Sequence, residues 1–400
     1  MHISRRAHHI QASPIRKLKP YADKAKERGT HVYHLNIGDP DVPTPRPVLD
    51  ALHAYNEPVI GYGPSQGFLD LRQSMTRYFG TYGIQLAADD INITTGGSEA
   101  IQFAFSAVGD PGDDILIPEP YYTNYNGYAA FADVRIVPIT TKAEEGFHLP
   151  PIEQFEKLIT PRTRALLLCS PNNPTGTIYT EEELEKAAWL VKKHDLFLIG
   201  DEVYKEFAYD GQKPISVLEL PGLENRTIVV DSVSKRFSSC GARIGCLVTR
   251  NHDAMEALIK FAQARLCPPA VEQIGALAAY RMDPSYFNPI REEYQKRRDV
   301  MFDALNRIEG VLLKKPRGAF YMIAKLKVKN ADDFAQWLLT DFSLDGGSVM
   351  IAPGDGFYGT PGRGLDEVRL AYVLNCGDIE KAMRIFQAAL KTYCSNNPCS

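Results

Sequence analysis

Short apolar runs alternate with longer amphipathic stretches through most of this 400-residue chain. Seven runs have the length and the nearly continuous apolar character of buried strands, at residues 91–94, 114–118, 134–139, 164–169, 196–200, 227–231 and 243–249. Helices are expected between them, for example at 98–108 and 181–194, where apolar residues recur at helical spacing. The alternation predicts an α/β fold whose mostly parallel central sheet is covered by helices on both faces.

The character of the chain changes after about residue 288. A long polar helix is expected at 289–307, followed by apolar segments at 311–313 and 319–326 and by a closing helix at 378–391. These elements predict a smaller C-terminal α/β domain at residues 289–400. The rest of the chain then divides into an N-terminal arm that also contributes to the small domain, residues 1–45, and a large domain, residues 46–288.

Bulk composition argues against two classes of partner. An apolar content of 44% and a charged content of 24% are ordinary for a soluble globular enzyme. The net charge of −4 disfavours a nucleic-acid-binding protein, which usually carries a basic stripe. No apolar run approaches the ~18–20 residues that cross a bilayer. We expect neither nucleic acid nor a membrane as a partner.

The seven cysteines form no C-x-x-C pair, and no metal site is expected. Four of them, between residues 169 and 267, lie in apolar or tight surroundings that favour a packing role. Cys394 and Cys399 lie in a polar tail whose simplest interpretation is a frayed end. This usage suits a reducing cytoplasm. The first 19 residues lack the apolar core of a secretory signal.

Lys235 lies in the frame Ser-x-Ser-Lys-x-Phe-x-x-x-Gly-x-Arg-x-Gly, residues 232–245, which follows an apolar run. A lysine acts as a covalent catalyst when it loses its proton and condenses with a carbonyl. The small residues allow a bulky anion to approach the backbone, and Arg243 offers a planar fork that grips phosphate. A lone lysine after a strand would be an ordinary surface residue, but the whole frame favours a catalytic site.

This frame resembles the pyridoxal phosphate (PLP) lysine signature of fold-type I, class I aminotransferases, and the aspartate aminotransferase subgroup in particular. The resemblance extends from about residue 13 to residue 390 and includes at least six motifs in the family's order. It implies a large PLP-binding domain and a small domain, with Lys235 as the PLP lysine and general base. It also implies transfer of an amino group between an L-amino acid and a 2-oxo acid.

Three further residues match the family's partners of the PLP ring. Asp201 would hold the pyridine nitrogen, and Tyr204 and Asn173 would hold the 3-oxygen, with Asn173 also near the substrate. An aspartate at a strand end is often only a helix N-cap. The string Asn-Pro-Thr-Gly at 173–176 is a turn in any case, but one that follows a strand, where α/β enzymes bind ligands.

The phosphate site of the family is matched by a Gly-Gly turn between a strand and a helix, where exposed amides bind anions. Gly97 and Ser98 would supply backbone N–H groups, and Ser232 and Arg243 would complete the cup. Tyr62, in a glycine-rich loop, matches the tyrosine that reaches the phosphate of the neighbouring subunit, so a homodimer with a shared active site is implied. For a lone tyrosine, packing would be the simpler interpretation.

Tyr122 matches the aromatic residue that stacks on the PLP ring, a contact worth ~0.5–1.5 kcal/mol beyond burial. Core packing is the stronger interpretation for its neighbours Tyr121 and Tyr125. Arg369 lies inside an apolar strand, where an arginine is costly unless paired. The family uses an arginine there to clamp the substrate α-carboxylate, with a backbone contact from Gly38. A structural salt bridge is the alternative for Arg369.

The substrate side chain is the least constrained feature. Some aspartate aminotransferases of this subgroup place a lysine where this chain has Ser98. The candidates to replace that lysine are Arg16, Lys17 and Arg265, although each would ordinarily be a surface charge. Aspartate with 2-oxoglutarate is the first expectation, and aromatic or other neutral amino acids come next. A carbon–sulfur β-lyase and a non-enzymatic regulatory module are the alternatives of other classes.

Overall fold

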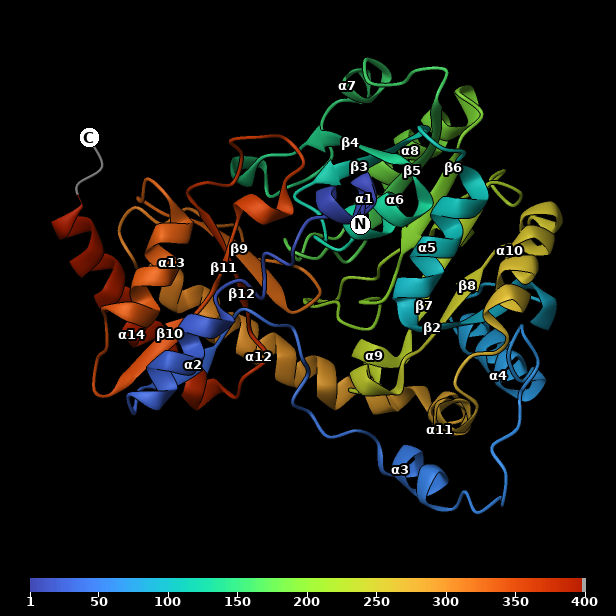
Figure 1. Cartoon of the computed structure of the whole chain (residues 1–400), viewed down its shortest axis with the longest axis horizontal. Coiled ribbons are helices and arrows are strands. Elements are labelled where there is room, and N and C mark those ends of the chain that lie inside the picture. Colours follow the sequence, from blue (N-terminus) through green and yellow to red (C-terminus); the bar gives the residue numbers. More distant parts are fainter. Residues whose placement is uncertain (398–400) are drawn as a thin grey trace.

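A computed structural model describes residues 1–397 of the chain, and seven strands form its central sheet in the order β2–β8–β7–β6–β5–β3–β4 (Figure 1). Strand β8 is antiparallel to β2 and β7, and all other pairs are parallel. The strands are β2 (Ile91–Thr95), β3 (Asp114–Glu119), β4 (Arg135–Thr140), β5 (Thr163–Cys169), β6 (Phe197–Asp201), β7 (Thr227–Ser232) and β8 (Ile244–Val248). All seven predicted strands are therefore in one mostly parallel sheet, as expected.

Helices cover both faces of this sheet because successive strand residues face opposite sides and nearly all are apolar. In β5, Ala165 and Leu167 pack in one core, whereas Leu166 and Leu168 pack in the other. The first core includes α5 (Gly96–Val108), α6 (Tyr125–Ala132) and α10 (His252–Arg265). The second includes α3 (Arg46–His53), α4 (Leu69–Gly80), α7 (Ile152–Glu156), α8 (Glu181–Lys193) and α11 (Ala270–Tyr280).

The C-terminal part of the chain builds two smaller sheets around a core of its own. One is antiparallel, in the order β11 (Ala352–Pro353), β12 (Glu367–Ala371), β9 (Tyr321–Lys325). The other pairs β10 (Gly347–Met350) in parallel with β1 (His31–His34) from the N-terminal segment. Helices α2 (Lys19–Glu27), α12 (Phe287–Asn306), α13 (Ala331–Thr340) and α14 (Cys376–Asn396) surround them. The apolar segment 311–313 forms only an isolated bridge, between Leu312 and Lys325.

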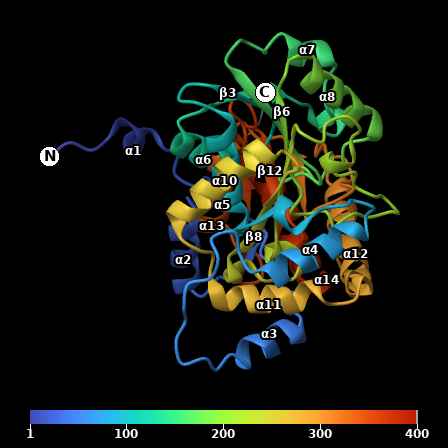
Figure 2. The ribbon, with the colours of Figure 1, turned by 90° about the vertical axis from the view of Figure 1, so that its right-hand side faces the viewer.

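Two short helices complete the chain, α1 (Arg5–His9) and α9 (Val233–Arg236). Helix α1 projects from the body of the molecule in the side view (Figure 2). None of the helices within residues 1–397 is long and apolar enough to span a bilayer. The cysteines at 169, 240, 246, 267 and 376 are free thiols, and Cys399 lies outside the described residues.

The parallel strands direct the functional loops to one edge of the central sheet. The loops after β2, β3, β5, β6 and β7 leave the sheet at this edge, and the antiparallel β8 begins there. In open α/β sheets, ligands bind outside the carboxyl ends of the strands. The small sheets lie beside this edge, so that β12 and the segment after β1 also reach it (Figure 1).

Candidate active site

A cavity of about 600 Å³ opens at this edge of the sheet, within the size range of small-molecule sites. All but one of the residues expected to bind PLP or the substrate α-carboxylate line it: Gly38, Gly97, Ser98, Tyr122, Asn173, Asp201, Tyr204, Ser232, Lys235, Arg243 and Arg369. The exception is Tyr62, which lies in the loop between α3 and α4 with its side chain 84% exposed. Tyr62 is expected to contact a neighbouring subunit. The structure contains one chain, so the role of Tyr62 stays a prediction.

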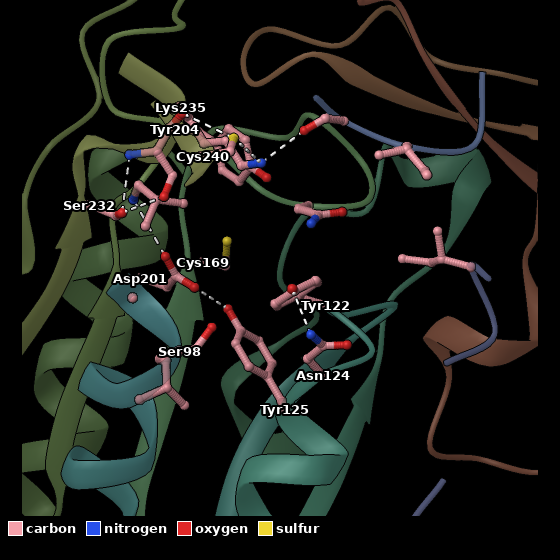
Figure 3. A pocket seen from close by; sticks show the side chains of 18 of the residues that line it. Ser98, Tyr122, Asn124, Tyr125, Cys169, Asp201, Tyr204, Ser232, Lys235 and Cys240 are labelled. Atoms are coloured by element: carbon pink, nitrogen blue, oxygen red, sulfur yellow. Dashed lines mark hydrogen bonds between the residues drawn. The ribbon is translucent and has the colours of Figure 1, made fainter. Parts of the chain in front are cut away.

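Lys235 reaches the cavity from α9, the short helix that directly follows β7. Ser232 caps this helix by accepting a hydrogen bond from Ser234 N, so the lysine is held one turn beyond the strand end. The Lys235 Nζ donates to the Gly38 carbonyl at 2.8 Å and to Cys240 Sγ at 3.5 Å (Figure 3). No carboxylate among the described residues forms an ion pair with it.

Asp201 ends β6 and points into the same cavity (Figure 3). Its Oδ1 accepts weakly from Val203 N at 3.4 Å, but a turn follows, so the helix N-cap interpretation is wrong. Burial raises the pKa of the Asp201 carboxyl to about 6 because the charged form is poorly solvated. Within residues 1–397 it has no ion-pair partner. A buried carboxylate without a cation favours a cationic ligand.

Arg369 is 1% exposed in the middle of β12. Its Nη1 donates to Asn173 Oδ1 at 2.9 Å and its Nη2 donates to the Asn36 carbonyl, while Nε has no partner. No acidic residue in the described part of the chain pairs with it, so the structural salt bridge is wrong. Burial lowers the pKa of this guanidinium. Two neutral acceptors leave the buried positive charge uncompensated, which is costly unless an anion binds.

The junction of β2 and α5 forms another part of the cavity wall. Gly96 has φ +69°, and a Cβ there would lie 2.2 Å from Nη2 of Arg243. A Cβ on Gly245 would lie 2.7 Å from the Gly97 amide nitrogen. Glycine is therefore required for β8 and the Arg243 guanidinium to approach the first turn of α5. The exposed amides of Gly97 and Ser98 and the arginine fork together suit a phosphate.

The sequence model of the family described as aminotransferase class I and II matches residues 30–358, most of the chain. The chain belongs to this family of aminotransferases.

Three relatives of this aminotransferase carry different substrates in their names. An aspartate aminotransferase of Bacillus subtilis is 31% identical over 96% of this chain and 97% of its own length. An aromatic-amino-acid aminotransferase of Thermococcus litoralis is 32% identical over 98% and 99%. The structure of an alanine aminotransferase from Pyrococcus furiosus has a TM-score of 0.89 at 31% identity, over 98% of this chain and 100% of that one. This family of enzymes uses PLP.

Tyr125 is a residue of the aminotransferase site that sequence reasoning assigned to core packing alone. It is fully buried in the core, but its phenol donates to Asp201 Oδ2 at 2.6 Å (Figure 3). Tyr321 was not singled out either, and its phenol lies 2.9 Å from that of Tyr204. Tyr125 follows Tyr122 by three residues at the start of α6, which is the only local signal that the two share a site.

The three cations considered for the substrate side chain differ in their surroundings. Lys17 pairs with Asp332 and, at 3.6 Å, with Asp355. Arg265 pairs with Glu99 at 2.9 Å and donates to the carbonyl of Ser65 at the same distance. Neither lines the cavity. Arg16 does line it.

Proposed function

We propose that this chain is a PLP-dependent aminotransferase that exchanges an amino group between an L-amino acid and a 2-oxo acid, with aspartate and 2-oxoglutarate as the preferred pair. The observation that carries the proposal is Arg369: a fully buried guanidinium in the cavity with no acidic partner among the described residues. Such a group is adapted to a carboxylate ligand, and both proposed substrates carry one next to the reacting carbon.

The donors and acceptors of the cavity fit PLP, which supplies an electron-accepting ring when it is bound. A phosphate group suits the amides of Gly97 and Ser98, the hydroxyl of Ser232 and the guanidinium of Arg243. These residues contribute positive charge and N–H groups at one end of the cavity. On the same side of the cavity, between Ser232 and Ser98, Asp201 offers a buried carboxylate to a protonated ring nitrogen (Figure 3). Tyr122 lies across the cavity from these groups and would offer a surface for stacking (Figure 3).

The roles of the protein groups follow from their positions. Arg369, Asn173 and the backbone of Gly38 would hold the substrate α-carboxylate, and Tyr204 would hydrogen-bond the 3-oxygen of PLP. Lys235 in its neutral form would take the proton from the substrate Cα and deliver it to the cofactor as a general base and acid. Its Nζ already lies 2.8 Å from the Gly38 carbonyl, so the base and the carboxylate site are adjacent.

The preference for aspartate is supported by the names of several relatives, the Bacillus subtilis enzyme among them. The aromatic-amino-acid relative is equally similar, which keeps aromatic or neutral substrates as the second candidate. We also infer a homodimer, since Val59, Ile60 and Tyr62 form an exposed apolar segment. In such a dimer Tyr62 would reach the phosphate of the partner subunit.

A single-turnover experiment with a panel of donors tests the proposal. Purified protein saturated with PLP is mixed separately with aspartate, glutamate, tyrosine, alanine or cysteine, without an acceptor, and the 2-oxo acid and ammonia are measured. Aspartate and glutamate should each give about one equivalent of 2-oxo acid per site and no ammonia. A fast reaction with tyrosine or alanine alone would favour the second candidate. Catalytic release of ammonia and pyruvate from cysteine would indicate a β-lyase instead.

A further inference from the structure

We propose that Arg16 binds the distal carboxylate of a dicarboxylic substrate and so determines the preference for aspartate and 2-oxoglutarate. The inference rests on the aminotransferase function proposed above and names the residue that would give it its substrate class. Arg16 belongs to the segment before α2, outside the central sheet. Ser13 and Ile15 of the same segment also line the cavity.

The charges that line the cavity single out Arg16. Four cationic side chains line it: Arg16, Lys235, Arg243 and Arg369. The last three have roles toward PLP and the α-carboxylate. Arg16 lines the cavity and is exposed, and its guanidinium makes no hydrogen bond or ion pair with any residue in 1–397. Of the two lining carboxylates, Asp201 serves the ring nitrogen and Asp39 contacts Cys240.

The backbone that carries Arg16 is fixed relative to Arg369. Asn36 connects the two, because its carbonyl accepts from Arg369 Nη2 and its Nδ2 donates to the Ile15 carbonyl at 3.2 Å. Pro14, which precedes Ile15, packs closely on Gly356. A Cβ on Gly356 would lie 2.3 Å from the Pro14 Cβ. The two arginines therefore come from rigidly connected segments, as required to hold two carboxylates of one small molecule.

Neighbouring residues of this segment face different surroundings. Ser13, Ile15 and Arg16 line the cavity, whereas Lys17 turns to Asp332 and Asp355 and anchors the segment. Arg265 is held by Glu99 and by backbone carbonyls. Ser98, which also lines the cavity, carries no charge. Arg16 is thus the cation of the cavity that is free to bind a second carboxylate, and its planar fork suits bidentate binding.

Steady-state kinetics of Arg16→Met, with Lys19→Met as the control, test this assignment. Lys19 lies three residues away, pairs with Asp23 on the surface and does not line the cavity, so its loss removes the same charge elsewhere. In Arg16→Met, kcat/KM for aspartate and glutamate should fall about 100-fold, while kcat/KM for alanine changes less than about threefold. Arg16→Lys should recover part of the loss, and Lys19→Met should behave as wild type.

Binding of the unreactive dicarboxylate succinate, measured by calorimetry, gives a second readout that requires no turnover. Its affinity should fall in Arg16→Met by a similar factor, while the affinity for propionate is unchanged. An equal loss for aspartate and alanine, or no loss for either, would overturn the role of Arg16. A wild-type enzyme that transfers amino groups only from neutral donors would also overturn it and leave the aminotransferase function intact. No transfer from any donor would instead contradict the proposed function itself.

Discussion

Tyr125 stabilises the ionised form of Asp201 by donating a hydrogen bond to its Oδ2 at 2.6 Å. Burial acts in the opposite direction and raises the pKa of Asp201 to about 6. The carboxylate is therefore present above this pH and is neutralised below it. Since a neutral carboxyl cannot pair with a protonated ring nitrogen, we expect the affinity of the apoprotein for PLP to decline on the acidic side of about pH 6.

Replacing Tyr125 by phenylalanine should move this decline to higher pH. The lost hydrogen bond to a charged group is worth roughly 1.5–3 kcal/mol, which corresponds to about one to two pH units in the carboxyl pKa. The measurement is the dissociation constant of PLP as a function of pH. Tyr121→Phe is the matched control, since its phenol contacts Asn126 rather than Asp201. Identical pH profiles for wild type and Tyr125→Phe would contradict this role for Tyr125.

Single residues could be predicted from the sequence where a motif fixes both their type and their spacing. Lys235, Asn173 and Arg369 belong to such motifs, and the fold brings them to one cavity. Tyr125 and Tyr321 belong to none. The sequence predicted Tyr125 as a core residue, and its side chain is indeed buried in the core. Its hydrogen bond to Asp201 joins segments that are 76 residues apart. Contacts of this kind depend on the packing of two strand ends, which local periodicity does not encode.

At the scale of elements, the junction between β2 and α5 shows how glycines shape the phosphate end of the cavity. Gly96 combines a left-handed backbone with the close approach of Arg243. Gly211 has a similar φ of +74° but open space around it. Comparing substitutions at these two glycines therefore distinguishes the effect of backbone strain from the effect of a side chain that obstructs the site.

Gly96→Ala should weaken PLP binding at least about tenfold because the new Cβ displaces the Arg243 guanidinium. Gly211→Ala should leave PLP affinity unchanged. Both substitutions should lower the free energy of unfolding of the apoprotein by about 1–2 kcal/mol, since both place alanine in the left-handed region. PLP titration and denaturant unfolding measure the two effects. If both variants bound PLP as wild type does, the account of the phosphate end would be incorrect.

The strands of the central sheet could be predicted because each is a nearly continuous apolar run, and their ends are within a residue or two of the expected positions. Their spatial order and the antiparallel direction of β8 could not be derived from periodicity, which is a property of each strand alone. The segment 311–313 was too short for a ladder and forms one bridge. Local patterns thus specify strands better than their pairing.

At the scale of the whole molecule, we propose that two bodies enclose the cavity between them. One is the large domain, residues 46–288, and the other is the small domain together with the N-terminal arm. Residues from both parts line it, among them Arg369 on β12 and Asp201 on β6. The sequence could not decide which of the adjacent cations, Arg16 or Lys17, enters the cavity. That choice depends on how this segment packs against Asn36 and against Gly356, which is far along the chain.

Hybrid dimers test whether the active site is shared between subunits. Subunits with Lys235→Ala and subunits with Tyr62→Ala are unfolded together, refolded and supplied with PLP. In a hybrid dimer with shared sites, one site carries both substitutions and the other carries neither. The mixture should therefore be more active than the mean of the two parent proteins. Activity equal to the mean of the two parents would mean that Tyr62 acts within its own subunit or not at all.

The most direct test of the central claim is the transfer of ¹⁵N from labelled aspartate to 2-oxoglutarate, measured by mass spectrometry with PLP-saturated wild type and Lys235→Ala. Wild type should form labelled glutamate over many turnovers, and Lys235→Ala should form none above the rate with free PLP, because Lys235 is the proposed base for the Cα proton. Labelled glutamate from Lys235→Ala at the wild-type rate, or labelled ammonia in place of glutamate from wild type, would contradict the account.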